Sequence, residues 1–233
     1  MNFFYSPYYG FGPGMFLLFP AIILAMYAQG KVRSTFNKYL RVMNSQGITG
    51  AQAARMILDR NGLRDIRVEP IGGYLSDHYD PKSRVLRLSP QVHNSNSIAA
   101  ISVAAHEAGH AMQHGAEYIP LTLRNTIAPI ASFASQSWML LVFAGFLLGW
   151  ANAIDLAILL YLSAVVFHII TLPVEYNASS RALEALEANG LLLSEEVRPA
   201  KKVLNAAALT YVAAAAVSIA HLLRLLMIRG RRD

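Results

Sequence analysis

The sequence contains no cysteine among its 233 residues. This absence excludes a disulfide framework, a zinc site built from thiolates and a cysteine nucleophile. Any metal ion held by the chain must therefore be bound by histidine, aspartate or glutamate side chains.

Charged residues are also scarce. They make up 15% of the chain, whereas soluble domains contain about 25%. Because 55% of the residues are hydrophobic and the mean hydropathy is +0.36, we predict an integral membrane protein, too short for several large domains. The net charge of +6 comes from Lys and Arg beside apolar runs, without a basic and aromatic groove pattern. The expected partner is therefore the lipid bilayer and not nucleic acid.

Long uncharged runs predict about four transmembrane helices. Residues 1–30 carry no charge and lack the basic start of a signal peptide, so we expect an uncleaved first helix, led by the aromatic FGPG stretch. Residues 127–174 contain two apolar runs, each long enough to cross ~30 Å of hydrocarbon, and predict a transmembrane hairpin. Residues 203–233 are expected to form a fourth transmembrane helix and a basic tail.

A polar region with mixed secondary structure lies at residues 31–126. Thr49 and Ser97 are expected to be helix N-caps, the second of them for a helix of about five turns. The stretches DIRVEPI and RVLRLS resemble paired strands, with a turn between them at Asp80-Pro81. The RVLRLS strand could be plain core sheet or could accept an extended peptide as an added strand.

The basic residues predict the orientation in the membrane. Lys and Arg follow the first apolar run and flank the hairpin, and the hairpin tip has none. By the positive-inside rule the polar regions, including a helical segment at 175–202, should face the cytoplasm. The tail opposes this rule, because Arg229, Arg231 and Arg232 would lie outside if the last run spans the membrane. The alternative is that the last run packs against the other helices without crossing; we favour crossing.

The stretch HEAGH is typical of a zinc site. His106 and His110 lie four residues apart, so on a helix both imidazoles can reach one Zn²⁺ at ~2.0–2.1 Å. Glu107 can then act as the general base for a water on the metal. Gly109 removes a side chain beside the second histidine and lets another segment approach. The alternative is an amphipathic helix whose histidines are satisfied by hydrogen bonds.

A third ligand has to come from elsewhere. The extended histidine pattern HExxHxxGxxH fails, because Gln113 and Ala116 stand at its glycine and last histidine positions. His114 lies ~12 Å along the helix from His106, which favours a surface or orienting role. Glu175 is the better candidate, because the hairpin returns the chain to the membrane face it left. A simple interfacial charge is the alternative for Glu175.

The segments HEAGHAMQH, PVEYNASSRALEAL and SDHYDPKSRVLRLSP together resemble the YugP-like family of bacterial membrane zinc metallopeptidases. The resemblance implies a mainly α membrane protein in which residues 31–126 form a small cytoplasmic zincin-like α+β metallopeptidase portion carrying the HExxH helix. It also implies a gluzincin with one Zn²⁺ bound by His106, His110 and Glu175, located in the bacterial cell membrane as a multi-pass protein.

The EYNAS segment is more distantly similar to the EYxAD segment of HtpX-like and CAAX-prenyl proteases. Those relatives have an aspartate where this chain has Ser179. The aspartate is expected to orient a ligand histidine, so Ser179, Asn177 or some other group would have to do so here. The group that stabilises the transition state stays open among four candidates: Tyr176, His114, Arg181 and Tyr211.

The sequence thus predicts a membrane-embedded zinc endopeptidase. Its expected substrate is a polypeptide, either membrane-associated or misfolded. One alternative is a non-catalytic membrane scaffold or pseudoprotease with a structural metal site, although such a site would not need Glu107. A metal transporter is the other alternative, but the expected spanning segments contain few ionisable residues.

Overall fold

The computed structural model describes residues 13–150 and 152–230. The start of the FGPG lead-in and the last arginines of the basic tail lie outside these residues. The chain divides into two compact units, which we describe separately. The first unit contains residues 1–27, 123–171 and 211–233, and the second contains residues 28–122 and 172–210.

Among the residues that the structure describes, four helices are long and apolar enough to cross a membrane, so the chain is a mainly α membrane protein with a small α+β portion. The helices are α2 (Leu18–Tyr39), α6 (Ile119–Leu147), α7 (Asn152–Ala188) and α8 (Ser194–Arg229), and a short α1 (Pro13–Phe16) precedes them. Each of the four contributes residues to both units.

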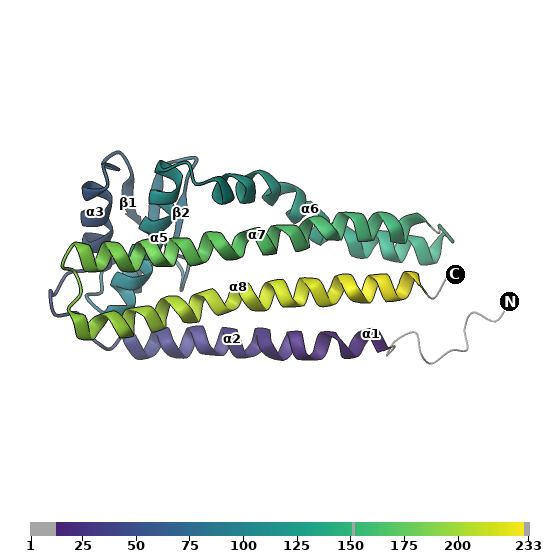
Figure 1. The fold of residues 1–233 in the computed structure, drawn as a ribbon, viewed down its shortest axis with the longest axis horizontal. Helices are drawn as coiled ribbons and strands as arrows, with labels where there is room; N and C mark the ends of the chain where they lie inside the picture. The colour runs from purple at the N-terminus through teal and green to yellow at the C-terminus, as the bar shows by residue number, and fades with distance from the viewer. Residues whose placement is uncertain (1–12, 151, 231–233) are drawn as a thin grey trace. The chain divides into compact units, whose positions relative to one another are not determined.

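Helix α7 does not end where its apolar run ends. It continues without a break through Glu175 to Ala188 (Figure 1). From the sequence we predicted two separate segments, residues 127–174 and 175–202. The polar continuation is rich in Ala, Leu and Glu, which favour helix without requiring a membrane. The hydropathy of the sequence therefore changes within α7 and does not mark where the helix ends. The membrane boundary at residue 174 stays a prediction.

In the first unit, α6, α7 and α8 meet through aromatic side chains. The Trp138 ring lies 5.3 Å from the Tyr161 ring and 5.8 Å from the His221 ring, measured between centroids. An ion pair of 2.7 Å joins Arg229, at the end of α8, to Asp155 in the first turn of α7. The end of α8 therefore lies beside the start of α7, and Asp155 compensates the charge of Arg229.

The second unit contains a three-stranded sheet of order β1-β3-β2. Strand β1 (Arg67–Pro70) pairs in parallel with β3 (Val85–Leu88), and β2 (His78–Asp80) pairs antiparallel with β3. The predicted pairing is present, but β2 was missed because it is short and partly exposed throughout. Since β3 is the central strand among the described residues, RVLRLS has no open edge for an added peptide strand, and that suggestion was wrong.

The two helix caps and the turn predicted for this unit are present. Thr49 caps α3 (Gly50–Arg60) with a capping box to Gln52, and Ser97 Oγ accepts from Ala100 N at 3.1 Å to cap α5 (Ile98–Gly115). The Asp80 carboxylate accepts backbone hydrogen bonds that close the turn after β2. Each of these features depends on residues that are close together in the sequence, so it could be predicted without knowledge of tertiary contacts.

Helix α5 is the buried centre of the second unit. Its buried residues include a series of alanines that pack in one hydrophobic core with side chains of α3, β3 and the polar halves of α7 and α8. The short helix α4 (Pro90–His93) passes so close to α3 that a Cβ atom on Gly50 would meet the Val92 carbonyl. Small residues thus let the helices around α5 approach closely.

Candidate metal centre

The candidate centre begins with a close crossing of two helices in the second unit. A Cβ atom on Gly109 of α5 would lie only 2.5 Å from the carbonyl oxygen of Ala178 on α7. The approach expected at Gly109 is therefore present, and only glycine permits it without displacement. The crossing brings the EYNAS segment of α7 against the HEAGH segment of α5.

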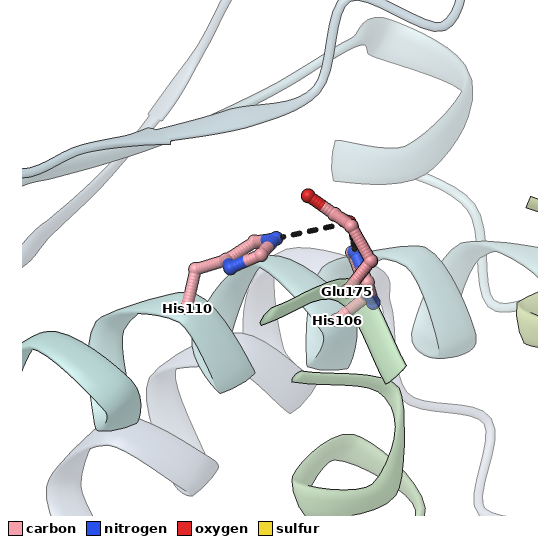
Figure 2. A group of neighbouring side chains, drawn as sticks. All are labelled: His106, His110 and Glu175. Atoms are coloured by element: carbon pink, nitrogen blue, oxygen red, sulfur yellow. Dashed lines mark hydrogen bonds and ion pairs between the residues drawn. The ribbon is translucent and has the colours of Figure 1, made fainter. Parts of the chain in front are cut away.

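Three side chains converge at this crossing (Figure 2). Glu175 Oε2 lies 3.2 Å from Nε2 of His106 and 3.5 Å from Nε2 of His110. Ligand atoms of the three residues all lie within 4.8 Å of one another, and all three side chains are buried. His106, His110 and Glu175 could therefore hold a metal ion between them.

The spacing suits zinc. Ligands bound tetrahedrally at ~2.0–2.1 Å are separated from one another by ~3.3–3.4 Å. The two nitrogen–oxygen distances lie on either side of that value. Two imidazoles and one carboxylate are also a donor set that catalytic zinc sites use, leaving a fourth position for water or substrate. The chemistry of the donor set and these two distances thus fit zinc.

Each histidine has a partner for its other ring nitrogen. Nδ1 of His106 lies 3.1 Å from Ser179 Oγ, and Nδ1 of His110 lies 3.0 Å from Gln113 Oε1. Such contacts fix the ring orientation and leave Nε2 directed toward the metal position. Of the two residues expected to orient a histidine, Ser179 makes this contact. Asn177 instead accepts hydrogen bonds from Gln113 and Arg181.

Glu107 is held by the sheet. The backbone N–H of Tyr79 on β2 donates to Glu107 Oε2 at 3.0 Å. Burial raises the pKa of Glu107 to about 7; nearby His106 opposes the rise, and the Glu175 charge adds to it. A carboxyl group with a pKa near neutrality can both accept and return a proton at physiological pH, which suits a general base.

Four residues were predicted as candidates for stabilising the transition state. His114 Nδ1 lies 2.8 Å from the hydroxyl of Tyr79, and His114 is not in the group of side chains that could share the ion. Tyr176 is 51% exposed, and Arg181 donates to Asn177. Tyr211 belongs to the first unit.

The sequence reasoning missed two residues that contact the centre, Gln113 and Tyr79. Gln113 was considered only as a departure from the extended histidine pattern, although it follows His110 by one helical turn and so lies on the same helix face. Tyr79 lies within the SDHYDPKS segment, but its contact with Glu107 is made through the backbone. A backbone contact leaves no signal in the choice of residue type.

Comparison with known proteins gives two matches. A family model described as "Putative neutral zinc metallopeptidase" matches residues 14–230. The chain is 53% identical over 214 residues to the "Putative membrane protease YugP" of Bacillus subtilis (strain 168), covering 92% of this chain and 95% of that protein. No solved structure gives a significant match.

Proposed function

Because the chain belongs to the family of neutral zinc metallopeptidases, we propose that it is a membrane-embedded zinc endopeptidase of the gluzincin type. In this proposal His106, His110 and Glu175 bind one zinc ion, and Glu107 is the general base. The observation that carries it is the position of Glu175 Oε2, 3.2 and 3.5 Å from Nε2 of the two histidines. A structural metal site would not require the buried carboxyl group of Glu107 beside it.

The chain's own residues have distinct roles in peptide hydrolysis. When bound, zinc supplies Lewis acidity that polarises the scissile carbonyl and acidifies a water molecule. Glu107 takes a proton from the attacking water and returns it to the leaving amine. The Tyr79 N–H holds the Glu107 carboxylate by a hydrogen bond, and the contacts of Ser179 and Gln113 keep the imidazoles in their binding orientation.

We also propose a location and a substrate class. Three basic residues that follow the first apolar run, Lys31, Arg33 and Lys38, lie in the part of α2 that belongs to the second unit. This supports a cytoplasmic position for the centre in a bacterial cell membrane. The substrate is a polypeptide, either membrane-associated or misfolded. This substrate class is supported by the membrane helices of the chain and by its similarity to a membrane protease.

The test uses the purified full chain in detergent. Metal content and hydrolysis of an unfolded casein are measured before chelation, after chelation and after zinc is restored. We expect activity to disappear and return with zinc, and Glu107→Gln to keep zinc while losing hydrolysis. The matched control is Glu117→Gln, an exposed glutamate just beyond α5. Hydrolysis by a purified Glu107→Gln protein would refute the mechanism, and zinc-loaded wild type without activity would favour a scaffold or pseudoprotease.

A further inference from the structure

We propose that Gln113 is a positioning residue that sets His110 in its metal-binding tautomer and fastens α5 to the α7 segment that carries Glu175. The inference rests on the proposed function, because it concerns the same ligand set. Gln113 is fully buried and contacts His110, Val174 and Asn177.

Which atoms donate in these hydrogen bonds follows from Arg181, which bonds to Asn177. The guanidinium of Arg181 can only donate, and its Nε donates to Asn177 Oδ1 at 2.9 Å. The Asn177 atom in this contact is therefore the amide oxygen. The same oxygen accepts a hydrogen bond from Gln113 Nε2 at 2.9 Å. The same Nε2 donates to the Val174 carbonyl at 2.8 Å, so both hydrogens of the Gln113 amide are used on α7.

The amide oxygen of Gln113 is thereby turned toward His110. An amide oxygen has no hydrogen to give, so Nδ1 of His110 must donate across the 3.0 Å contact. With its proton on Nδ1, the neutral His110 ring presents a lone pair at Nε2. This lone pair faces Glu175 Oε2 at 3.5 Å, so the nitrogen and the carboxylate oxygen are placed to bind one metal ion together.

Gln113 also acts on the other ligand through the backbone. Val174 immediately precedes Glu175, so the bond from Gln113 to the Val174 carbonyl holds the backbone next to that carboxylate. One buried amide therefore holds a histidine ligand from α5 and the backbone beside a glutamate ligand from α7. This is how ligands from two different helices can be arranged before the ion arrives.

Three variants separate positioning from general stability. Gln113→Met has a similar length but removes every hydrogen bond, whereas Gln113→Glu still accepts from Nδ1 and loses the donors to α7. Asn44→Leu is the matched control, since Asn44 is also a buried amide that bonds two backbone carbonyls, but in the loop before α3. For each full-length protein in detergent we measure zinc affinity against a chromophoric chelator, the visible spectrum with Co²⁺, and thermal stability without metal.

We expect Gln113→Met to lose about 10–100-fold in zinc affinity and to alter the cobalt spectrum, with Gln113→Glu between it and wild type. Asn44→Leu should lower thermal stability and leave zinc affinity unchanged. The inference is overturned if Gln113→Met binds zinc like wild type, if Gln113→Glu binds no better than Gln113→Met, or if Asn44→Leu loses as much affinity. If wild type itself takes up no zinc, the proposed function fails together with the inference.

Discussion

Glu175 Oε2 lies 3.2 Å from Nε2 of His106, although the two residues are 69 positions apart in the sequence, with all of α6 between them. Glu175 is almost fully buried, with 1% of its surface exposed. Burying a carboxylate is costly unless it is paired or coordinates a metal.

Removing the carboxylate should release the metal. We expect Glu175→Ala to lose most of its zinc, because two imidazoles alone leave the ion without its third protein ligand. Metal content after gel filtration measures this directly. Glu187→Ala, an exposed glutamate later on α7, should keep the wild-type zinc content. Full zinc occupancy in Glu175→Ala would show that the ligand set is wrong.

Ser179 should strengthen the binding of zinc by His106. Ser179→Ala removes the contact with Nδ1 of His106, and we expect zinc affinity to fall by about tenfold. Ser179→Asp should restore or exceed wild-type affinity, because a carboxylate accepts the Nδ1 proton more strongly than a hydroxyl does. Chelator competition measures both variants. Equal affinities for all three proteins would exclude a role for Ser179 in orienting the ligand.

The helix crossing should not tolerate a larger side chain at Gly109. Gly109→Ala places a methyl group against the Ala178 carbonyl, and overpacking of this kind costs about 1–3 kcal/mol. Since separation of α5 from α7 also moves Glu175 away from the histidines, zinc affinity should fall as well. Gly30→Ala is the control, because nothing lies within 4 Å of the added atom. Unchanged stability and zinc binding in Gly109→Ala would contradict the crossing.

The Tyr79 hydroxyl should serve structure and not catalysis. Tyr79→Phe breaks the bond to His114 and keeps the backbone N–H that holds Glu107. We expect kcat to change by less than about tenfold and stability to fall by about 1 kcal/mol. Loss of a hydroxyl that stabilised the transition state would instead lower kcat by about 100-fold or more. Steady-state kinetics on an unfolded polypeptide distinguishes these outcomes.

Asp77 should make the stability of the metal-free protein depend on pH. Burial raises the pKa of Asp77 above its ordinary value, although hydrogen bonds from Ser89 oppose the rise. A carboxyl group with a raised folded pKa is most favourable while it is protonated, so its contribution should be lost as pH increases through that pKa. Thermal unfolding should show wild type losing stability relative to Asp77→Asn as the pH rises above about 4, the ordinary pKa of an aspartate. A difference that stays constant across this range would contradict the prediction.

Features that depend on near neighbours could be read from the sequence. The helix caps at Thr49 and Ser97 are present as predicted, because a cap involves residues within one turn. The apolar runs predicted membrane helices, since length and hydropathy are properties of a single segment. The spacing of His106 and His110 likewise predicts a shared helix face without any knowledge of the fold.

The sequence by itself therefore determined the chemistry that was available: two histidines and a glutamate on one helix, and a distant glutamate beyond a hairpin. Only the tertiary structure decided that Ser179 and not Asn177 contacts His106, and that Gln113 links His110 to α7. These contacts depend on how closely α5 and α7 cross at Gly109. Such a crossing is set by packing across the whole second unit, and no pattern within either helix encodes the register at which they meet.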